Sequence, residues 1–430
     1  MTDTVRTRGD DFGGTPLDPD LQLRRRPPFG EFVALVAFMM GLTAFAVDNV
    51  LPAFPALGRT FAVSDPNRLQ LLVYVYMIGF GLTHLVYGPA SDIFGRRPAF
   101  LAGLAVFLLG CVAAAFAPNF ETLLAARCLQ GCGAASGRVV AVAIVRDRFV
   151  GREMARVMSL TMMVFITVPV FAPAIGSLLL IVGDWHAIFV SMVVLGIALG
   201  TWFVRRMPET LRAENRQPFS GASIASGFKA TATCRAAFGY STAFGLMFGG
   251  IMAYVGSAQQ IFAEDVYHLG GLFPLAFGGV ALMMGLAALV NSRLVRRFGM
   301  HRISHVSMLC YLALSVAQCA FAFGFGGRPP LWIFGGILGL SQFFSSLSMP
   351  NFNALAMEPL GRIAGTASSL IGFYTTLVGA VCGAFVGQHY DGTVVPLALG
   401  YVAFSIAVVL VVLATERGRL FTQTHPEAPR

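Results

Sequence analysis

An aspartate and an arginine stand inside apolar segments of this chain, where an isolated charge is costly. Asp48 lies in the stretch "FAVDNVLPAFP", residues 45–55, well inside a long apolar run. A charge within a hydrocarbon layer costs several kcal/mol unless it is paired or hydrated. An acid at such a position therefore points to function. The structural alternative is an acid that only hydrogen-bonds the end of a neighbouring helix.

Arg127 is the expected partner of Asp48. At a rise of about 1.5 Å per residue, Asp48 lies about 25 Å along its helix, and Arg127 lies roughly 9 Å below the outer surface in a helix that runs inward. The two residues therefore fall at a similar depth, and no other acid lies deep in an apolar run. We expect the two side chains to contact each other as an ion pair.

A second arginine shares a helix face with Arg127. Arg127, Gly131, Ala134 and Arg138 follow one another at spacings of four, three and four residues, which place them on one face. Arg138 either binds an anionic or acceptor-rich substrate or extends its guanidinium towards the cytoplasm. A larger set of candidate substrate-binding residues comprises Asn49, Arg138, Asn353 and Tyr374.

Two further motifs are typical of moving parts rather than of catalysis. In "GPASDIFGRRP", Gly95 allows a tight turn, and Asp92 can pair with Arg146 or face the start of a later helix. This motif predicts a cytoplasmic gate built from Gly88, Asp92, Gly95, Arg96, Arg97 and Arg146. In "VPVFAPAIGSL", the residues Pro169, Pro173 and Gly176 interrupt one helix and permit bending or close packing, although ordinary helix irregularity would look the same.

The elements that must position these residues are membrane-spanning helices. Of the 430 residues, 56% are hydrophobic and 12% are charged, about half the charged share of a soluble protein. The apolar runs are about 20 residues long, and polar and apolar residues do not alternate within them. This pattern indicates an all-α membrane protein rather than a β-barrel. The predicted spans are 31–56, 69–90, 98–117, 121–145, 155–181, 186–205, 236–261, 272–294, 302–325, 331–356, 364–387 and 394–414.

The spans divide the chain into two six-helix bundles. We expect a disordered cytoplasmic tail over 1–30, one bundle over 31–206, a cytoplasmic linker over 207–235, a second bundle over 236–415 and a tail over 416–430. The loop "GPASDIFGRRPAF" aligns with "SRLVRRFGMHRIS" in the second half at an offset of 204 residues. This internal repeat favours two pseudo-symmetric bundles that rock around a site near the midplane, although a basic loop at a cytoplasmic end is common enough to arise by coincidence.

Charge predicts the orientation and excludes several functions. Of 30 Lys and Arg residues, three lie in the loops opposite the termini and two lie inside a span. The other 25 lie on the side of the termini, which places both termini in the cytoplasm. Basic residues spread over seven segments do not favour nucleic-acid binding. The seven cysteines are scattered, and no metalloprotease, Walker or nucleophile-elbow motif is present. We therefore expect no enzyme, cofactor or metal, and a transport process driven by an ion or substrate gradient.

The motifs resemble those of the major facilitator superfamily. "GPASDIFGRRP" resembles its loop after the second helix, and "RCLQGCGAA" resembles its fourth-helix motif, which is tied to proton coupling. "VPVFAPAIGS" resembles the fifth-helix antiporter motif in part: Pro173 and Gly176 agree, whereas Val168, Ala172 and Ser177 stand where glycines are usual.

More narrowly, "VDNVLPAFPAL", "IVRD", "DWHAIF" and "MPNFNALAMEPLGRIAGTASSL" resemble the Bcr/CflA drug-resistance subfamily, with Asn49 and Val50 in place of the usual Met-Tyr. The resemblance implies a proton-coupled exporter of chloramphenicol- or bicyclomycin-like drugs in a bacterial inner membrane. It further implies that Asp48 carries the proton and Arg127 is its charge partner.

Other functions remain open at this stage. A transporter of a metabolite such as an amino acid, peptide or sugar derivative fits the same pattern. A membrane-embedded enzyme, a receptor or a passive channel fits it less well. We expect a monomer in the lipid bilayer that acts on a small-molecule substrate.

Overall fold

The computed structural model describes residues 27–212, 214, 216 and 221–421, and these residues form helices without strands. The first half of the chain contains α2 (Phe29–Asp48), α3 (Phe54–Thr60), α4 (Leu71–Phe94), α5 (Arg96–Ala115), α6 (Phe120–Arg148), α7 (Gly151–Val182) and α8 (Trp185–Arg206). The second half contains α10 (Arg235–Gln259), α11 (Phe273–Phe298), α12 (Met300–Gly324), α13 (Leu331–Met357), α14 (Ala364–Gln388) and α15 (Val395–Thr415). Short helical turns, including η1 (Leu51–Ala53), η2 (Pro66–Gln70) and η4 (Gln260–Asp265), connect or extend them.

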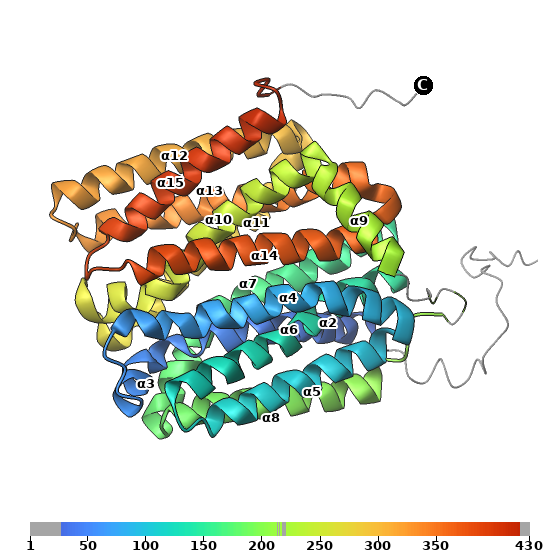
Figure 1. Ribbon diagram of the computed structural model, residues 1–430, viewed down its shortest axis with the longest axis horizontal. Helices are drawn as coiled ribbons and strands as arrows, with labels where there is room; N and C mark the ends of the chain where they lie inside the picture. Colours follow the sequence, from blue (N-terminus) through green and yellow to red (C-terminus); the bar gives the residue numbers. More distant parts are fainter. Residues whose placement is uncertain (1–26, 213, 215, 217–220, 422–430) are drawn as a thin grey trace, which may run out of the picture.

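Within the described residues, twelve helical segments are long and apolar enough to cross a membrane. Each overlaps one predicted span, and several extend a few residues further because helical hydrogen bonding continues into polar ends. Figure 1 shows the first half lying beside the second, with both ends of the described chain on the same side of the molecule. We call this side, where α2 begins and α15 ends, the terminal face, and the other side the opposite face.

The segment between the halves contains a helix that the sequence reading did not resolve. Residues 221–233 form α9 (Gly221–Thr233), which lies at the terminal face beside the start of α14 (Figure 1). A Cβ on Gly227 would lie 2.7 Å from Thr366 of α14, so the two helices approach closely. The helix follows a polar, proline-containing stretch, and its own residues are less apolar than a membrane span, so hydropathy does not reveal it.

The internal repeat is visible in backbone geometry. α4 ends at Gly95 with φ 106°, and α11 ends at Gly299 with φ 76°. Each glycine directly precedes the next helix, α5 or α12. Positive φ is a conformation that glycine adopts without steric cost, so both one-residue turns depend on it. The same turn therefore occurs at the same place in each half.

The two halves meet through two helix pairs, α4 with α14 and α7 with α11. α4 and α14 pack closely both near the middle of the helices and near the terminal face. A Cβ on Gly81 would lie 3.3 Å from Thr376, and a Cβ on Gly88 would lie 2.2 Å from the Oγ of Ser369. Buried apolar side chains continue from one half into the other as one core.

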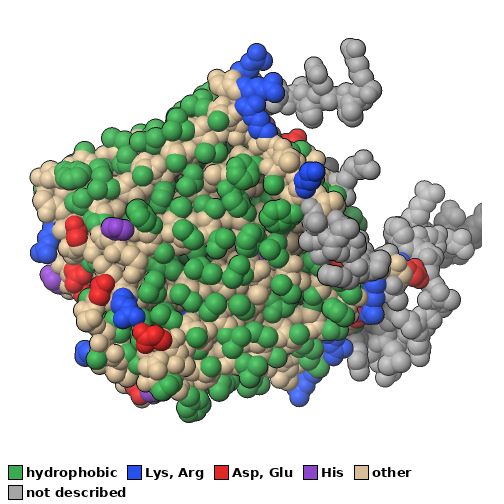
Figure 2. All heavy atoms as spheres, in the orientation of Figure 1, with side chains coloured by type: hydrophobic (Ala, Val, Ile, Leu, Met, Phe, Trp, Pro, Cys, Tyr) green, Lys and Arg blue, Asp and Glu red, His purple; other side chains and the backbone are tan. Residues whose placement is uncertain are grey.

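Apolar side chains also cover the outside of the helical bundle. Figure 2 shows them spread across the middle of the molecule, while coloured charged side chains gather towards the two ends. Such a belt matches a hydrocarbon layer bounded by two polar surfaces. The protein is therefore a multi-pass membrane protein whose helices run between the two faces.

Candidate functional site

The first membrane segment breaks at the aspartate. α2 ends at Asp48, a turn follows at Asn49 and Val50, and the segment resumes as η1 and α3. Pro52 lies in the first turn of η1, where it cannot donate a hydrogen bond back to the carbonyl of Asp48. Asn49 and Val50 keep right-handed helical backbone angles, so the regular α-helical hydrogen bonding stops here while the membrane segment continues. The carboxylate thus sits at the end of a regular helix inside the membrane segment.

Asp48 is the only buried carboxylate among the described residues, with 5% of its surface exposed. Its side chain makes no hydrogen bond or ion pair within the described part of the chain. Its charge acts on two buried phenols, Tyr76 of α4 and Tyr254 of α10. Because α10 belongs to the second half, the carboxylate lies where the two halves meet. The Tyr254 hydroxyl is itself buried without a hydrogen-bond partner.

Arg127 does not form the predicted ion pair with Asp48. Its Nε donates to the carbonyl of Leu72 at 3.0 Å, and one terminal nitrogen donates to the carbonyl of Ala46 at 3.0 Å and to Gln130. The guanidinium also lies over the ring of Tyr76, 4.5 Å from its centroid. The depth prediction is consistent with this arrangement, since Ala46 is two residues from Asp48. The contact prediction is wrong for this structure, because the break in α2 exposes a backbone carbonyl that accepts from the arginine instead.

Asn49 and the α7 motif form one packed contact. Asn49 is fully buried, and its amide nitrogen donates to Ser191 at 3.4 Å. A Cβ on Gly176 would lie 2.4 Å from the Asn49 carbonyl oxygen, so only glycine lets α7 approach so closely. α7 nonetheless stays one continuous helix through Pro169 and Pro173. In this structure Asn49 thus contacts helices rather than an open surface, and its role in substrate binding remains a prediction.

Arg138 is exposed, and it lies in the half of α6 that is nearer the terminal face. Its helix face is the one on which Gly131 packs against Tyr76 of α4 and Ala134 accepts a hydrogen bond from Thr43 of α2. Its charge also acts on His84, a buried residue of α4 that packs against Gly372 of α14. The exposed guanidinium therefore faces the junction of the halves rather than lipid. It makes no hydrogen bond or ion pair within the described residues, so it is available to an acceptor-rich ligand.

The terminal-face loop is held by acids that the sequence reading assigned only in part. Arg96 binds Asp147 of α6 through two hydrogen bonds of 2.8 and 3.3 Å, and it also pairs with Asp92. Glu209, which follows α8, accepts from the backbone amides of Arg96 and Arg97 at 2.9 and 3.0 Å. The loop is thereby tied to α6 and to the start of the inter-half segment.

The predicted pairing of Asp92 with Arg146 is not formed. Asp92 instead pairs with Arg96, four residues later in the sequence. Arg146 is exposed, and its guanidinium lies 4.0 Å from the position that a Cβ on Gly365 of α14 would occupy. Arg97 instead donates to the carbonyl of Val204. Asp147, the residue after Arg146, joins the end of α6 to this loop by accepting hydrogen bonds from Arg96.

The two candidate residues of the second half lie in different settings. Asn353 is exposed on α13. Tyr374 is half-buried between α14 and α10, where its hydroxyl shares a 3.0 Å hydrogen bond with Thr242 and its ring packs against Phe238. Tyr374 therefore contributes to packing within the second half, and its contact with substrate remains a prediction.

A polar network that the sequence reading missed joins the halves at the opposite face. The amide nitrogen of Gln70 donates to the side-chain oxygen of Gln260 at 2.5 Å, and Gln260 donates to Asn67 at 3.0 Å. Asn67 in turn donates to the carbonyl of Tyr390 at 2.7 Å, and Gln388 donates to the carbonyl of Asn67 at 2.7 Å. Amides at the ends of apolar runs were the available signal, but their partners lie 190 or more residues away in sequence.

The arrangement of helices and polar side chains defines a class of protein. Two bundles of membrane helices meet along two helix pairs, with one unpaired acid and one free arginine facing their junction. The described cysteines are free, and the polar groups at the junction do not form a nucleophile, base and oxyanion site. This is the architecture of a membrane transporter.

The chain belongs to the Major Facilitator Superfamily, whose sequence profile matches residues 34–384. It is 32% identical over 391 residues to the uncharacterized MFS-type transporter YdgK of Bacillus subtilis, covering 89% of this chain and 95% of that protein. It is 29% identical over 373 residues to a bicyclomycin resistance protein homolog of Haemophilus influenzae, covering 85% and 91%. The crystal structure of the human organic anion transporter MFSD10 superposes with a TM-score of 0.65 at 18% identity, covering 91% of this chain and all of that one.

Proposed function

We propose that this protein is a proton-coupled antiporter that exports small amphipathic drugs, with Asp48 as the proton carrier. The observation that carries the proposal is the state of Asp48: it is buried, it has no ion pair or hydrogen bond among the described residues, and it lies where the two halves meet. An acid held by an arginine would stay ionised. An acid without such a partner changes its protonation with its access to water.

The relationship to a bicyclomycin resistance protein homolog supports a drug as the substrate. The sequence motifs favour chloramphenicol- and bicyclomycin-like compounds in particular. The excess of Lys and Arg on the terminal face supports a bacterial inner-membrane orientation with that face in the cytoplasm. In this orientation the free guanidinium of Arg138 lies nearer the cytoplasm than Asp48, on the route that an exported compound takes.

Alternating access requires the two halves to separate at one face at a time. The Asn67–Gln70–Gln260–Gln388 network is suited to close the opposite face, because its hydrogen bonds connect η2 of the first half with η4 and α14 of the second. The close contact of Gly88 with Ser369 is suited to close the terminal face. Proton binding at Asp48 neutralises the charge between the halves, which lowers the cost of closing them around it.

A metabolite transporter is the second candidate. The partial fifth-helix motif favours it, since Val168, Ala172 and Ser177 replace expected glycines on α7. In such a protein Arg138 would bind the carboxylate of an amino acid or peptide. A neutral drug such as chloramphenicol would then produce no proton movement.

The two candidates are separated by proton flux in liposomes. Purified protein is reconstituted with a pH-sensitive dye inside, and candidate substrates are added one at a time. If the protein exchanges protons for drugs, addition of chloramphenicol or bicyclomycin should change the pH inside the liposomes. The sign of the change depends on which way the protein is inserted. A response only to amino acids, peptides or sugars would refute drug transport. A response to neither drugs nor metabolites, with the protein folded and inserted, would refute proton-coupled exchange of both classes.

The matched control is a carboxylate outside the junction. Glu264 lies exposed on η4, and it makes no ion pair or hydrogen bond within the described residues. Glu264→Gln removes one carboxylate from the same protein and should leave the drug-induced proton flux unchanged. Asp48→Asn should abolish it.

A further inference from the structure

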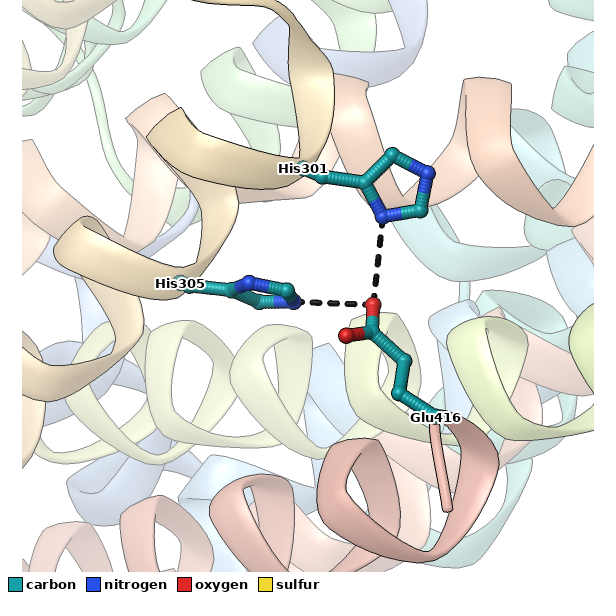
Figure 3. A group of neighbouring side chains, drawn as sticks. All are labelled: His301, His305 and Glu416. Carbon is teal, nitrogen blue, oxygen red and sulfur yellow. Dashed lines mark hydrogen bonds and ion pairs between the residues drawn. The ribbon is translucent and has the colours of Figure 1, made fainter. Parts of the chain in front are cut away.

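Two histidines and a glutamate converge at the terminal face of the second half, away from the transport site. His301 and His305 lie one turn apart near the start of α12, and Glu416 directly follows the end of α15. Figure 3 shows both imidazole rings directed at the same carboxylate oxygen. His301 Nδ1 lies 3.2 Å and His305 Nε2 lies 2.9 Å from Glu416 Oε1. One ligand atom from each residue lies within 4.8 Å of the others.

We propose that His301, His305 and Glu416 form a binding site for a divalent transition-metal ion of the zinc class. Two imidazoles four residues apart on one helix and a carboxylate from a second element are a donor set that suits Zn²⁺, and it leaves a fourth position for water. The ion would join α12 to the end of α15.

The two oxygens of the Glu416 carboxylate differ in their contacts. His301, His305 and Tyr240 each hydrogen-bond this carboxylate. All three donors converge on Oε1, whereas Oε2 is buried with no hydrogen-bond partner. An unsatisfied buried carboxylate oxygen is costly, and a metal ion would satisfy it.

Access and rigidity also suit an exchangeable ion. His305 is fully buried and Glu416 is 9% exposed at its side chain, whereas the side chain of His301 is 22% exposed. An ion can therefore enter past His301 and reach ligands that the core holds in place. The hydroxyl of Tyr240 contacts the same oxygen and would orient the carboxylate from outside the ligand set.

Metal binding has a consequence for the segment after α15. Nδ1 of His305 accepts a hydrogen bond from the backbone amide of Phe421 at 3.1 Å. A neutral imidazole that binds a metal through Nε2 carries its proton on Nδ1, which then becomes a donor. Two donors cannot share this contact, so metal binding would release the Phe421 amide and loosen the turn that contains Arg417 and Arg419.

The direct test is titration of the purified full-length chain, without an affinity tag, with Zn²⁺ by calorimetry and with Co²⁺ by visible absorption. We expect one ion per chain and the absorption bands of four-coordinate Co²⁺. His305→Ala and Glu416→Gln should each weaken binding by about 100-fold or more, since even second-shell changes cost 10–100-fold. Glu416→Gln keeps the side-chain shape, so its loss of binding cannot be assigned to misfolding of a cavity variant.

His389→Ala is the matched control. This histidine is exposed near the opposite face, and its ring bonds only the carbonyl of Phe385. The variant should bind Zn²⁺ as the unchanged protein does. Failure of the unchanged protein to bind one ion, or undiminished binding in both Glu416→Gln and His305→Ala, would overturn the proposal.

Limited proteolysis tests the consequence for the turn. Zn²⁺ should accelerate tryptic cleavage after Arg417 and Arg419 in the unchanged protein and have no effect in Glu416→Gln. Stoichiometric Zn²⁺ binding without faster cleavage would refute coordination through Nε2 of His305.

Discussion

Asp48→Asn is the substitution that tests the proposed function most sharply. The side chains have the same shape, and Asp48 loses no hydrogen bond or ion pair within the described residues, so the substitution removes only the ability to exchange a proton. A buried carboxylate without a partner carries a desolvation cost that an amide does not exceed. We therefore expect normal insertion and an unfolding temperature that does not fall.

The magnitude of the transport effect follows from the number of carriers. Asp48 is the only buried carboxylate among the described residues, which predicts one exchanged proton per cycle through this group. One charge moving through about 100 mV supplies about 2.3 kcal/mol. Since about 1.4 kcal/mol corresponds to a factor of ten, this sustains roughly a 40- to 50-fold gradient of a neutral drug. Without the carboxylate the sustained ratio should fall to about one.

The assay is drug accumulation in proteoliposomes energised by an imposed proton gradient. The unchanged protein and Glu264→Gln should reach the same steady-state ratio, and Asp48→Asn should reach equilibrium without accumulation. Thermal unfolding of the same preparations shows whether each variant is folded. A folded Asp48→Asn protein that still sustains a gradient of about tenfold or more would refute Asp48 as the proton carrier.

Three further variants test contacts within the first half and between the two halves. Arg127→Lys should lower the free energy of unfolding by at least about 2 kcal/mol. A lysine cannot reach all three acceptors of the guanidinium, and each buried acceptor left without a donor costs about 1–3 kcal/mol. An unchanged unfolding temperature would contradict this. Gly176→Val should cost about 1–3 kcal/mol by overpacking against Asn49, measured in the same way, and a neutral result would mean that α7 can move away freely. The double variant Gly88→Cys and Ser369→Cys should form a disulfide on oxidation, since the two Cβ positions are 3.3 Å apart. The disulfide should stop transport until a reductant is added. Transport by the cross-linked protein would show that α4 and α14 need not separate at this point.

The fold could be predicted from the sequence because the bilayer imposes it. Backbone groups in hydrocarbon must be satisfied within a segment, so a long apolar run has essentially one available structure, the helix. The internal repeat could also be predicted, because each half carries a glycine, Gly95 or Gly299, at the same place. Both turns need a positive φ, which glycine adopts without steric cost. α9 could not be predicted in this way, because its packing against Thr366 depends on a contact 139 residues from Gly227 rather than on hydropathy.

The site could be predicted only as far as depth and residue type. Helical rise places Asp48 and Arg127 at one level, but it does not decide which acceptor the guanidinium takes. That choice depends on the backbone: the turn at Asn49 frees the Ala46 carbonyl, which competes with the carboxylate. In the same way, Asp147 and Glu209 hold the terminal-face loop because of how α6 and the end of α8 approach it.

The break in α2 thus explains both the bound arginine and the unbound acid. Arg127 satisfies the carbonyls of Ala46 and Leu72 and so joins α2, α4 and α6 within the first half. Asp48 is left without a counterion among the described residues, and its charge acts across the junction on Tyr254, whose buried hydroxyl has no hydrogen-bond partner. A carboxylate whose environment comes partly from the other half changes its surroundings whenever the halves move, whereas a carboxylate paired within its own half does not. We therefore propose that the separation of Arg127 from Asp48 lets the protonation of Asp48 depend on the conformation of the transporter.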